Sequence, residues 1–138
     1  MRLLLLLLIS FSSFSQSVIG QWKTIDDNTN EPKSVVEIFE RDGKVFGKVI
    51  KLFRKPGENQ DPICDLCDTK DARYKKKVIG MEIMRNMVRD DDEYSGGDVL
   101  DPENGKVYRG KIWLENGNLK LRGYVGPFFR TQTWVREK

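Results

Sequence analysis

Cys64 and Cys67 are the only cysteines in this chain of 138 residues, and they lie in the segment DPICDLCD with two residues between them. A Cys-x-x-Cys pair serves as a redox centre, as part of a metal site or as a structural disulfide. A redox pair of the thioredoxin type needs a helix N-terminus inside an α/β fold, and the neighbouring sequence does not predict one. A zinc site needs four ligands, and the chain has no histidine and no third cysteine. We therefore expect a structural disulfide, with thiol–disulfide redox chemistry as an alternative and with no metal site or cofactor.

The missing histidine also excludes Ser-His-Asp and Cys-His catalysis in their usual forms. Paired carboxylates could still act as acid and base, but they must converge in a cleft, and convergence does not follow from a sequence. Glu37 is the strongest candidate, because it shares a strand face with Val35 and Phe39 and should point inward with them. We assign no catalytic residue and favour a protein that is not an enzyme.

The charge balance argues against nucleic acid as a partner. The chain has 24 basic and 21 acidic residues, a net charge of +3, and nucleic-acid binding needs many cations on one face. The cluster Lys75, Lys76 and Lys77 is more typical of a solvated turn. We predict no nucleic-acid partner.

The first fifteen residues predict export. Arg2 precedes an apolar run from Leu3 to Ile9, and Ser13 and Ser15 form the small-x-small pattern of a signal peptidase site. The run is far shorter than the roughly 20 apolar residues that span a bilayer. We predict a signal peptide over 1–15, cleaved near Ser15/Gln16. A single β-barrel domain over 16–138 follows, in the periplasm or outside the cell, with no transmembrane segment.

These residues must be positioned by strands, because the chain from Gly20 onward reads as short alternating segments separated by turn residues. Turns are predicted at Asp42-Gly43, Asn104-Gly105 and Asn116-Gly117. One long irregular loop, about 54–77, holds both cysteines. Methionines 81, 84 and 87 have helical spacing, so the fourth segment is either strand or helix, and we expect a strand. The predicted strands are Ile19–Ile25, Ser34–Glu40, Lys44–Phe53, Ile79–Val88, Tyr94–Leu100, Lys106–Leu114, Asn118–Val125 and Phe128–Arg136.

Eight sequential antiparallel strands leave two exposed edges unless the sheet closes on itself. The sequence therefore predicts an all-β protein, an eight-stranded antiparallel up-and-down barrel. A barrel of this size either packs its interior with side chains or holds one small ligand.

Gly20-Gln21-Trp22 at the head of the first strand resembles the G-x-W signature of lipocalin-like (calycin-like) barrels. That resemblance implies a tryptophan that plugs one end and stacks on an arginine of the last strand, here Arg130 or Arg136. Four stretches together resemble the bacterial secreted family called domain of unknown function 2147, over nearly the whole mature chain: GQWKT, SVVEIFERDGKVFGKV, GGDVLDPENGKVYRGKIWL and LKLRGYVGPFFRTQTWVRE. The resemblance implies a small exported lipocalin-like barrel and no assigned reaction.

The last strand determines the candidate binding site. If Trp134 faces the interior, then Gln132 and Arg130 face it too, because side chains alternate along a strand. Buried polar groups need partners in the protein or in a ligand. The predicted ligand-binding residues are Trp22, Glu37, Tyr108, Arg130, Gln132 and Trp134. A filled core, in which Arg130 and Glu37 pair with each other or with Tyr108, is the alternative.

The leading hypothesis is an exported, non-enzymatic protein that binds a small, partly apolar or amphipathic ligand at the barrel mouth, beneath a loop tethered by the disulfide. The first alternative is an interaction module with a packed barrel that binds another protein of the cell envelope. The second is a thiol–disulfide oxidoreductase that uses Cys64 and Cys67. The ligand, the physiological role and the oligomeric state do not follow from the sequence.

Overall fold

The computed structural model describes residues 16–138. The predicted signal peptide, 1–15, lies outside the described residues, so it stays a prediction together with the cleavage site. Within the described range the regular structure consists of eight strands and no helix. They are β1 (Gly20–Ile25), β2 (Pro32–Arg41), β3 (Lys44–Leu52), β4 (Glu82–Asp90), β5 (Glu93–Asp101), β6 (Lys106–Glu115), β7 (Asn118–Val125) and β8 (Phe128–Arg136).

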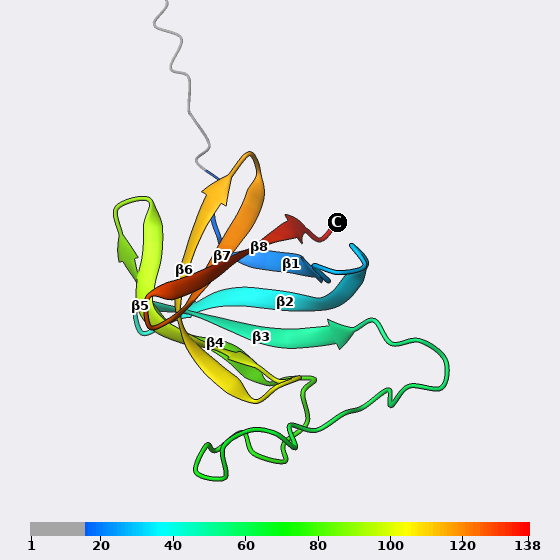
Figure 1. The fold of residues 1–138 in the computed structure, drawn as a ribbon. Coiled ribbons are helices and arrows are strands. Elements are labelled where there is room, and N and C mark those ends of the chain that lie inside the picture. Colours follow the sequence, from blue (N-terminus) through cyan, green and yellow to red (C-terminus); the bar gives the residue numbers. More distant parts are fainter. Residues whose placement is uncertain (1–15) are drawn as a thin grey trace, which may run out of the picture.

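Each strand pairs antiparallel with the next, and β8 pairs with β1 to close the barrel (Figure 1). This confirms the predicted all-β, eight-stranded up-and-down barrel. Closure is unequal around the ring. Seven residue pairs join β7 to β8, whereas the β1–β8 seam has only Trp22 opposite Arg136 and Lys23 opposite Val135.

Turn chemistry explains the short hairpins. Asp42 and Gly43 both have positive φ, as do Asn116 and Gly117, which is the conformation that matches a two-residue turn to the twist of its strands. The β5–β6 connection is longer and runs from Pro102 to Gly105.

The predicted fourth strand is present but begins at Glu82, so Met81 lies in the loop before it, and the spacing of Met84 and Met87 has a local cause. Met84 and Met87 are both buried in the barrel, although two residues, Arg85 and Asn86, separate them. On β3 their partners Gly47 and Val45 are only two positions apart, so β4 carries an extra residue. Asn86 has φ of 58° at this point. A β-bulge therefore shifts the alternation of side chains by one residue, so the two buried methionines are three positions apart, as they would be on one face of a helix.

The up-and-down order gives the barrel two different ends. The β2–β3, β4–β5 and β6–β7 hairpins lie at the end where β1 begins, which we call the closed end. The β1–β2, β5–β6 and β7–β8 turns and the long β3–β4 loop lie at the other end, which we call the mouth. Buried residues of all eight strands form one core between the ends, with Trp22 fully buried within it.

The β3–β4 connection covers residues 53–81 and is drawn in green in Figure 1. It is folded on itself by backbone hydrogen bonds between Pro62–Cys64 and Lys75–Val78, such as Cys64 N to Lys76 O at 2.9 Å. Arg73 ties the loop to β4 by donating to the backbone oxygen of Glu82 at 2.9 Å. The predicted irregular loop is therefore an ordered unit.

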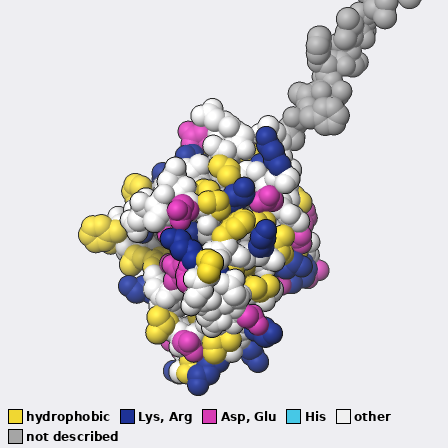
Figure 2. Space-filling view, turned by 90° about the vertical axis from the view of Figure 1, so that its right-hand side faces the viewer, with side chains coloured by type: hydrophobic (Ala, Val, Ile, Leu, Met, Phe, Trp, Pro, Cys, Tyr) yellow, Lys and Arg dark blue, Asp and Glu magenta, His cyan; other side chains and the backbone are white. Residues whose placement is uncertain are grey.

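Figure 2 shows one face of the molecule, on which apolar side chains lie among side chains of both charges. Residues 16–138 contain no helix with the length and apolar character needed to cross a bilayer.

Candidate ligand-binding site

A cavity of about 820 Å³ opens at the mouth of the barrel. Buried apolar side chains from five strands and from the long loop line its inner part: Val49, Val78, Ile83, Val99, Leu100, Leu121 and Trp134. A few neutral polar groups lie among them. The hydroxyls of Thr24 and Ser34 are 2.6 Å apart and partner each other on neighbouring strands.

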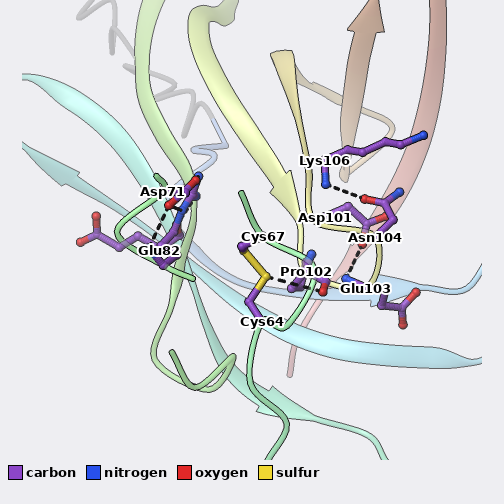
Figure 3. The surroundings of a disulfide bond; sticks show 10 residues. Cys64, Cys67, Asp71, Glu82, Asp101, Pro102, Glu103, Asn104 and Lys106 are labelled. Atoms are coloured by element: carbon purple, nitrogen blue, oxygen red, sulfur yellow. Dashed lines mark hydrogen bonds and ion pairs between the residues drawn. A yellow bond between two sulfur atoms is a disulfide. The ribbon is translucent and has the colours of Figure 1, made fainter. Parts of the chain in front are cut away.

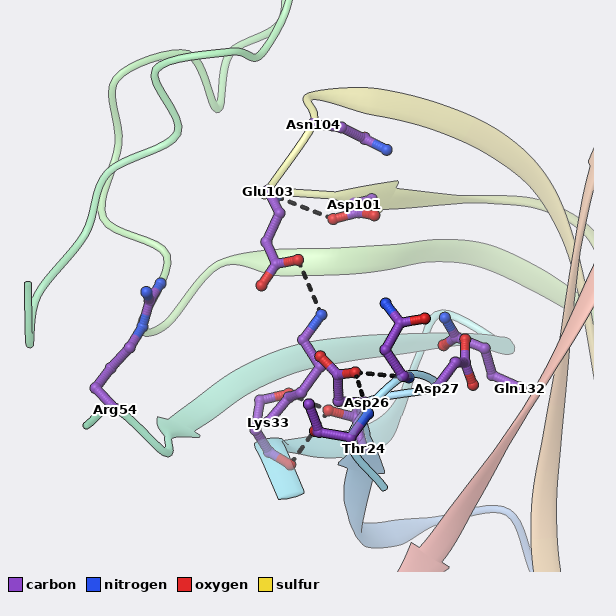
Figure 4. A network of polar contacts seen from close by, with 12 residues as sticks. Thr24, Asp26, Asp27, Lys33, Arg54, Asp101, Glu103, Asn104 and Gln132 are labelled. Atoms are coloured by element: carbon purple, nitrogen blue, oxygen red, sulfur yellow. Dashed lines mark hydrogen bonds and ion pairs between the residues drawn. The ribbon is translucent and has the colours of Figure 1, made fainter. Parts of the chain in front are cut away.

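Charged side chains surround the opening (Figure 4). Each cation that lines it is held by a carboxylate, which lowers the net attraction for a charged ligand. The pairs are Lys33 with Glu103, Arg54 with Glu58, Lys55 with Glu31 and Arg130 with Asp27.

Two acidic residues at the opening accept hydrogen bonds from backbone N–H groups of their own turns. The carboxylate of Asp26 accepts the backbone N–H groups of Thr29 and Asn28, and these bonds lower its pKa. Asp101 accepts the N–H of Glu103 at 2.9 Å in the β5–β6 turn. Both carboxylates therefore shape the opening.

The rim also exposes apolar side chains, an arrangement that the sequence analysis did not identify. Six of the exposed large hydrophobic residues line the cavity: Phe53, Ile63, Leu66, Val125, Phe128 and Phe129. A cavity with an apolar interior and an apolar rim offers a continuous apolar path for a ligand. Only the closed barrel brings these residues together, because they come from the long loop and from the ends of β7 and β8.

The last strand presents to the cavity the face that carries Trp134, a choice that the sequence had left open. Arg130, Gln132 and Trp134 all line it, with Trp134 buried and Arg130 at the exposed opening. The Trp134 Nε1–H donates to Gln132 Oε1 at 3.3 Å. Within the described part of the chain, the amide nitrogen of Gln132 has no hydrogen-bond partner, so it can donate to a ligand. The alternate residues Thr131 and Thr133 bond to outward-facing cations of β7.

Tyr108 lies at the cavity as predicted, with its hydroxyl accepting a hydrogen bond from the Asn104 amide at 3.2 Å. Trp22 does not line the cavity. It lies at the closed end, where its Nε1–H donates to Val18 O at 2.8 Å. Trp22 therefore forms part of the floor, as the G-x-W resemblance implied.

The prediction that Glu37 points inward is wrong. Val36 and Ile38 fill the core from β2, and Glu37 lies on the outer face, 3.6 Å from the Lys48 ammonium. Phe39 also faces outward and stacks on Phe46 with 5.9 Å between ring centres. The segment SVVEIF has apolar residues on both faces, so its alternation did not determine which face is buried. The alternative pairing of Arg130 with Glu37 or Tyr108 is likewise absent from the described residues, where Arg130 bonds to Asp27.

The cysteines form the expected disulfide, and both are buried, with exposed fractions of 0% and 4%. Cys64 Sγ lies 3.9 Å from Pro102 O (Figure 3), so the disulfide segment rests on the β5–β6 turn. No group of three or more Cys, Asp or Glu side chains that could hold a metal ion is found in residues 16–138.

Comparison with known proteins agrees with this architecture. A family described as "uncharacterized protein conserved in bacteria", DUF2147, matches residues 20–136. Among solved structures, a protein from the human pathogen Helicobacter pylori, described as belonging to the lipocalin family, has a TM-score of 0.75 at 20% sequence identity. The match covers 90% of this chain and 85% of that one, and at this identity it shows a shared lipocalin-like fold. No curated protein matches the chain.

Proposed function

This chain belongs to the bacterial family DUF2147, and we propose that it is a non-enzymatic protein that binds a small, partly apolar ligand in the barrel cavity. The observation that carries the proposal is the cavity of about 820 Å³ with its apolar inner lining. Small-molecule sites are typically cavities of roughly 300–1,000 Å³, mostly apolar and with a few polar groups that orient the ligand. Gln132, Tyr108 and the Thr24–Ser34 hydroxyl pair supply such groups here.

The ligand is expected to have an apolar body and an uncharged polar group. The cations at the opening are already paired with carboxylates, so an isolated anionic group would find no free partner there. Neutral donors and acceptors inside the cavity instead suit a hydroxyl, carbonyl or amide. Export is part of the proposal, and the disulfide is compatible with an oxidising compartment.

Titration with the neutral apolar fluorophore N-phenyl-1-naphthylamine tests the site. Its emission should rise on binding, and Trp134 should be quenched. Leu121→Trp adds bulk to the inner lining and should weaken binding at least tenfold, since the cavity loses the volume that the probe occupies. Val107→Trp adds the same side chain to an exposed position on β6 and should leave binding unchanged. Equal affinities of both variants and the native protein would exclude the cavity. If the probe binds in the cavity, native mass spectrometry of the protein purified from bacteria should identify the natural ligand.

The two alternatives fit the geometry less well. An interaction module with a packed barrel needs a filled interior, and the cavity weighs against that. A thiol–disulfide oxidoreductase needs an accessible sulfur, whereas both cysteines of the long loop are buried. Envelope pull-down and an insulin-reduction assay of Cys64→Ser would test these alternatives directly.

A further inference from the structure

The outer surface of β6, β7 and β8 carries cations and aromatic rings in a regular array. Ile112, Leu119 and Trp134 of these strands are buried in the core, so alternate residues point outward. Strand pairing arranges nine outward residues in three rows, which we call the basic–aromatic face. The rows are Trp113, Lys120 and Thr133; Lys111, Arg122 and Thr131; and Arg109, Tyr124 and Phe129.

The positive charges of this face are largely uncompensated. Lys111 forms an ion pair with Glu93 at 2.6 Å. Lys120 and Arg122 instead donate to threonine hydroxyls of β8, at 2.6 and 2.9 Å. Among residues 16–138, neither of these two cations nor Arg109 forms an ion pair. The face thus carries three unpaired positive charges, in a chain whose net charge is only +3.

The arrangement places two like charges side by side on neighbouring strands. Lys111 and Arg122 lie directly opposite each other in the β6–β7 pair, and like charges at such positions destabilise a sheet. The ion pair of Lys111 with Glu93, and stacking of Arg122 over Trp113 at 5.0 Å and over Phe129 at 4.5 Å, offset this repulsion. A local conflict of this kind is expected where a surface has a function.

The β7–β8 tip, at the mouth end of this face, exposes apolar side chains. Phe129 belongs to the outward rows, whereas Val125 and Phe128 alternate with it and line the cavity. Val125, Phe128 and Phe129 have exposed fractions of 56%, 76% and 60%. Phe129 belongs to both regions, because it pairs with Tyr124 and lies beneath the Arg122 guanidinium. Cations beside exposed aromatic and aliphatic side chains are typical of surfaces that bind lipid bilayers.

We propose that the basic–aromatic face and the β7–β8 tip together bind the surface of a bilayer that contains anionic lipids. The cations would lie against the headgroups, and the tip would enter the boundary of the acyl chains. A bilayer fits better than a dissolved polyanion because the tip needs an apolar phase. Phe128 and Phe129 also line the cavity, so binding in this orientation brings the mouth to the lipid surface. The proposal does not depend on the cavity holding a ligand.

Flotation with vesicles of phosphatidylcholine, alone or mixed with phosphatidylglycerol, tests the proposal. The native protein should bind only the mixed vesicles and should be released at high salt. Lys120→Gln with Arg122→Gln should weaken binding by about fivefold for each charge removed. Lys75→Gln with Lys76→Gln removes the same charge from the long loop and should have little effect.

The tip has its own matched pair of variants. Val125→Ser with Phe128→Ser should weaken binding on the order of tenfold because apolar area is lost from the lipid contact. Ile79→Ser with Val88→Ser alters two exposed apolar residues elsewhere and should leave vesicle binding unchanged. All variants carry the same N-terminus, determined by mass spectrometry, and unchanged melting temperatures show that they fold. Three results would overturn the proposal. They are equal binding to uncharged vesicles, equal losses of binding in Lys120→Gln/Arg122→Gln and Lys75→Gln/Lys76→Gln, and binding of dissolved polyphosphate that is unchanged by the tip variants.

Discussion

The guanidinium carbon of Arg136 lies 4.0 Å from the centre of the Trp22 ring, and its nitrogens donate to Ile19 O at 3.0 Å and Ser17 O at 2.9 Å. One side chain of the last strand therefore holds both the first strand and the segment before it. Because the β1–β8 seam contains only two residue pairs, this cluster contributes much of the closure of the barrel.

Loss of this cluster should destabilise the whole barrel. Trp22→Ala removes a fully buried indole and should cost about 3–5 kcal/mol. Arg136→Ala removes the stacking and two hydrogen bonds and should cost about 1–3 kcal/mol. Denaturant unfolding measures both. Arg109→Ala, on the outer face of β6, is the matched control and should change stability by less than about 0.5 kcal/mol. Equal effects of the two arginine variants would contradict the role of Arg136.

Gly105 should be essential for seating the disulfide segment on the barrel. A Cβ at this position would lie within bonding distance of the backbone oxygen of Leu66, so Gly105→Ala must lift the segment from the β5–β6 turn. Hydrogen exchange should then accelerate at 62–67 and remain slow in β1 and β8. Gly57→Ala, where the added Cβ meets nothing, is the control for a glycine of positive φ. Protected amides at 62–67 in Gly105→Ala would show that the contact is dispensable.

Reduction of the disulfide should loosen the loop and leave the barrel folded. Closing so short a loop restricts the unfolded chain by only on the order of 2 kcal/mol. Cys64→Ser with Cys67→Ser should therefore raise hydrogen exchange over 53–81 and lower the melting temperature by no more than about 10 °C. Native protein with and without dithiothreitol provides the comparison. Cooperative loss of every strand on reduction would contradict this expectation.

Acid should weaken the attachment of the long loop to β4. Hydrogen bonds from Arg73 lower the pKa of Asp71 to about 2. A carboxylate with a lowered pKa stabilises the fold fully above its unfolded pKa, near 4, and this stabilisation is lost as the pH falls toward 2. Asp71→Asn should therefore lower the melting temperature at pH 7, and the difference from the native protein should shrink below about pH 4.

Asp65→Asn, at an exposed position of the same loop, is the control for the Asp71 prediction and should show little difference at either pH. A melting-temperature difference for Asp71→Asn that is the same at pH 7 and near pH 2 would exclude the ionised Asp71–Arg73 pair as its source.

Gln132 should orient a ligand that carries a polar group. Gln132→Leu removes the free amide donor and should weaken binding of 1-naphthol several-fold more than binding of naphthalene, because only the former has a hydroxyl. Thr131→Leu, on the outer side of the same strand, should affect neither compound. Equal losses for both compounds in Gln132→Leu would indicate a change in cavity shape rather than a lost hydrogen bond.

Local rules account for what the sequence alone determined. Alternation of side chains and dipeptides such as Asn116-Gly117 involve neighbours along the chain, so the eight strands and their order were predictable, whereas the inward face of β8 was left open. The resemblance to the G-x-W signature implied a floor of Trp22 stacked on Arg130 or Arg136, and the structure selects Arg136. The close cysteine pair predicted the disulfide.

The tertiary structure decided what depends on contacts between distant segments. Glu37 could not be oriented from SVVEIF, because outward-facing Phe39 finds cover in Phe46 of the next strand. The β4 bulge became visible only in the register against β3. The cavity, its apolar rim and the basic–aromatic face exist only because closure of the sheet brings together side chains from several strands and loops. Local patterns carry no information about such long-range distances, which the packing of the closed barrel sets.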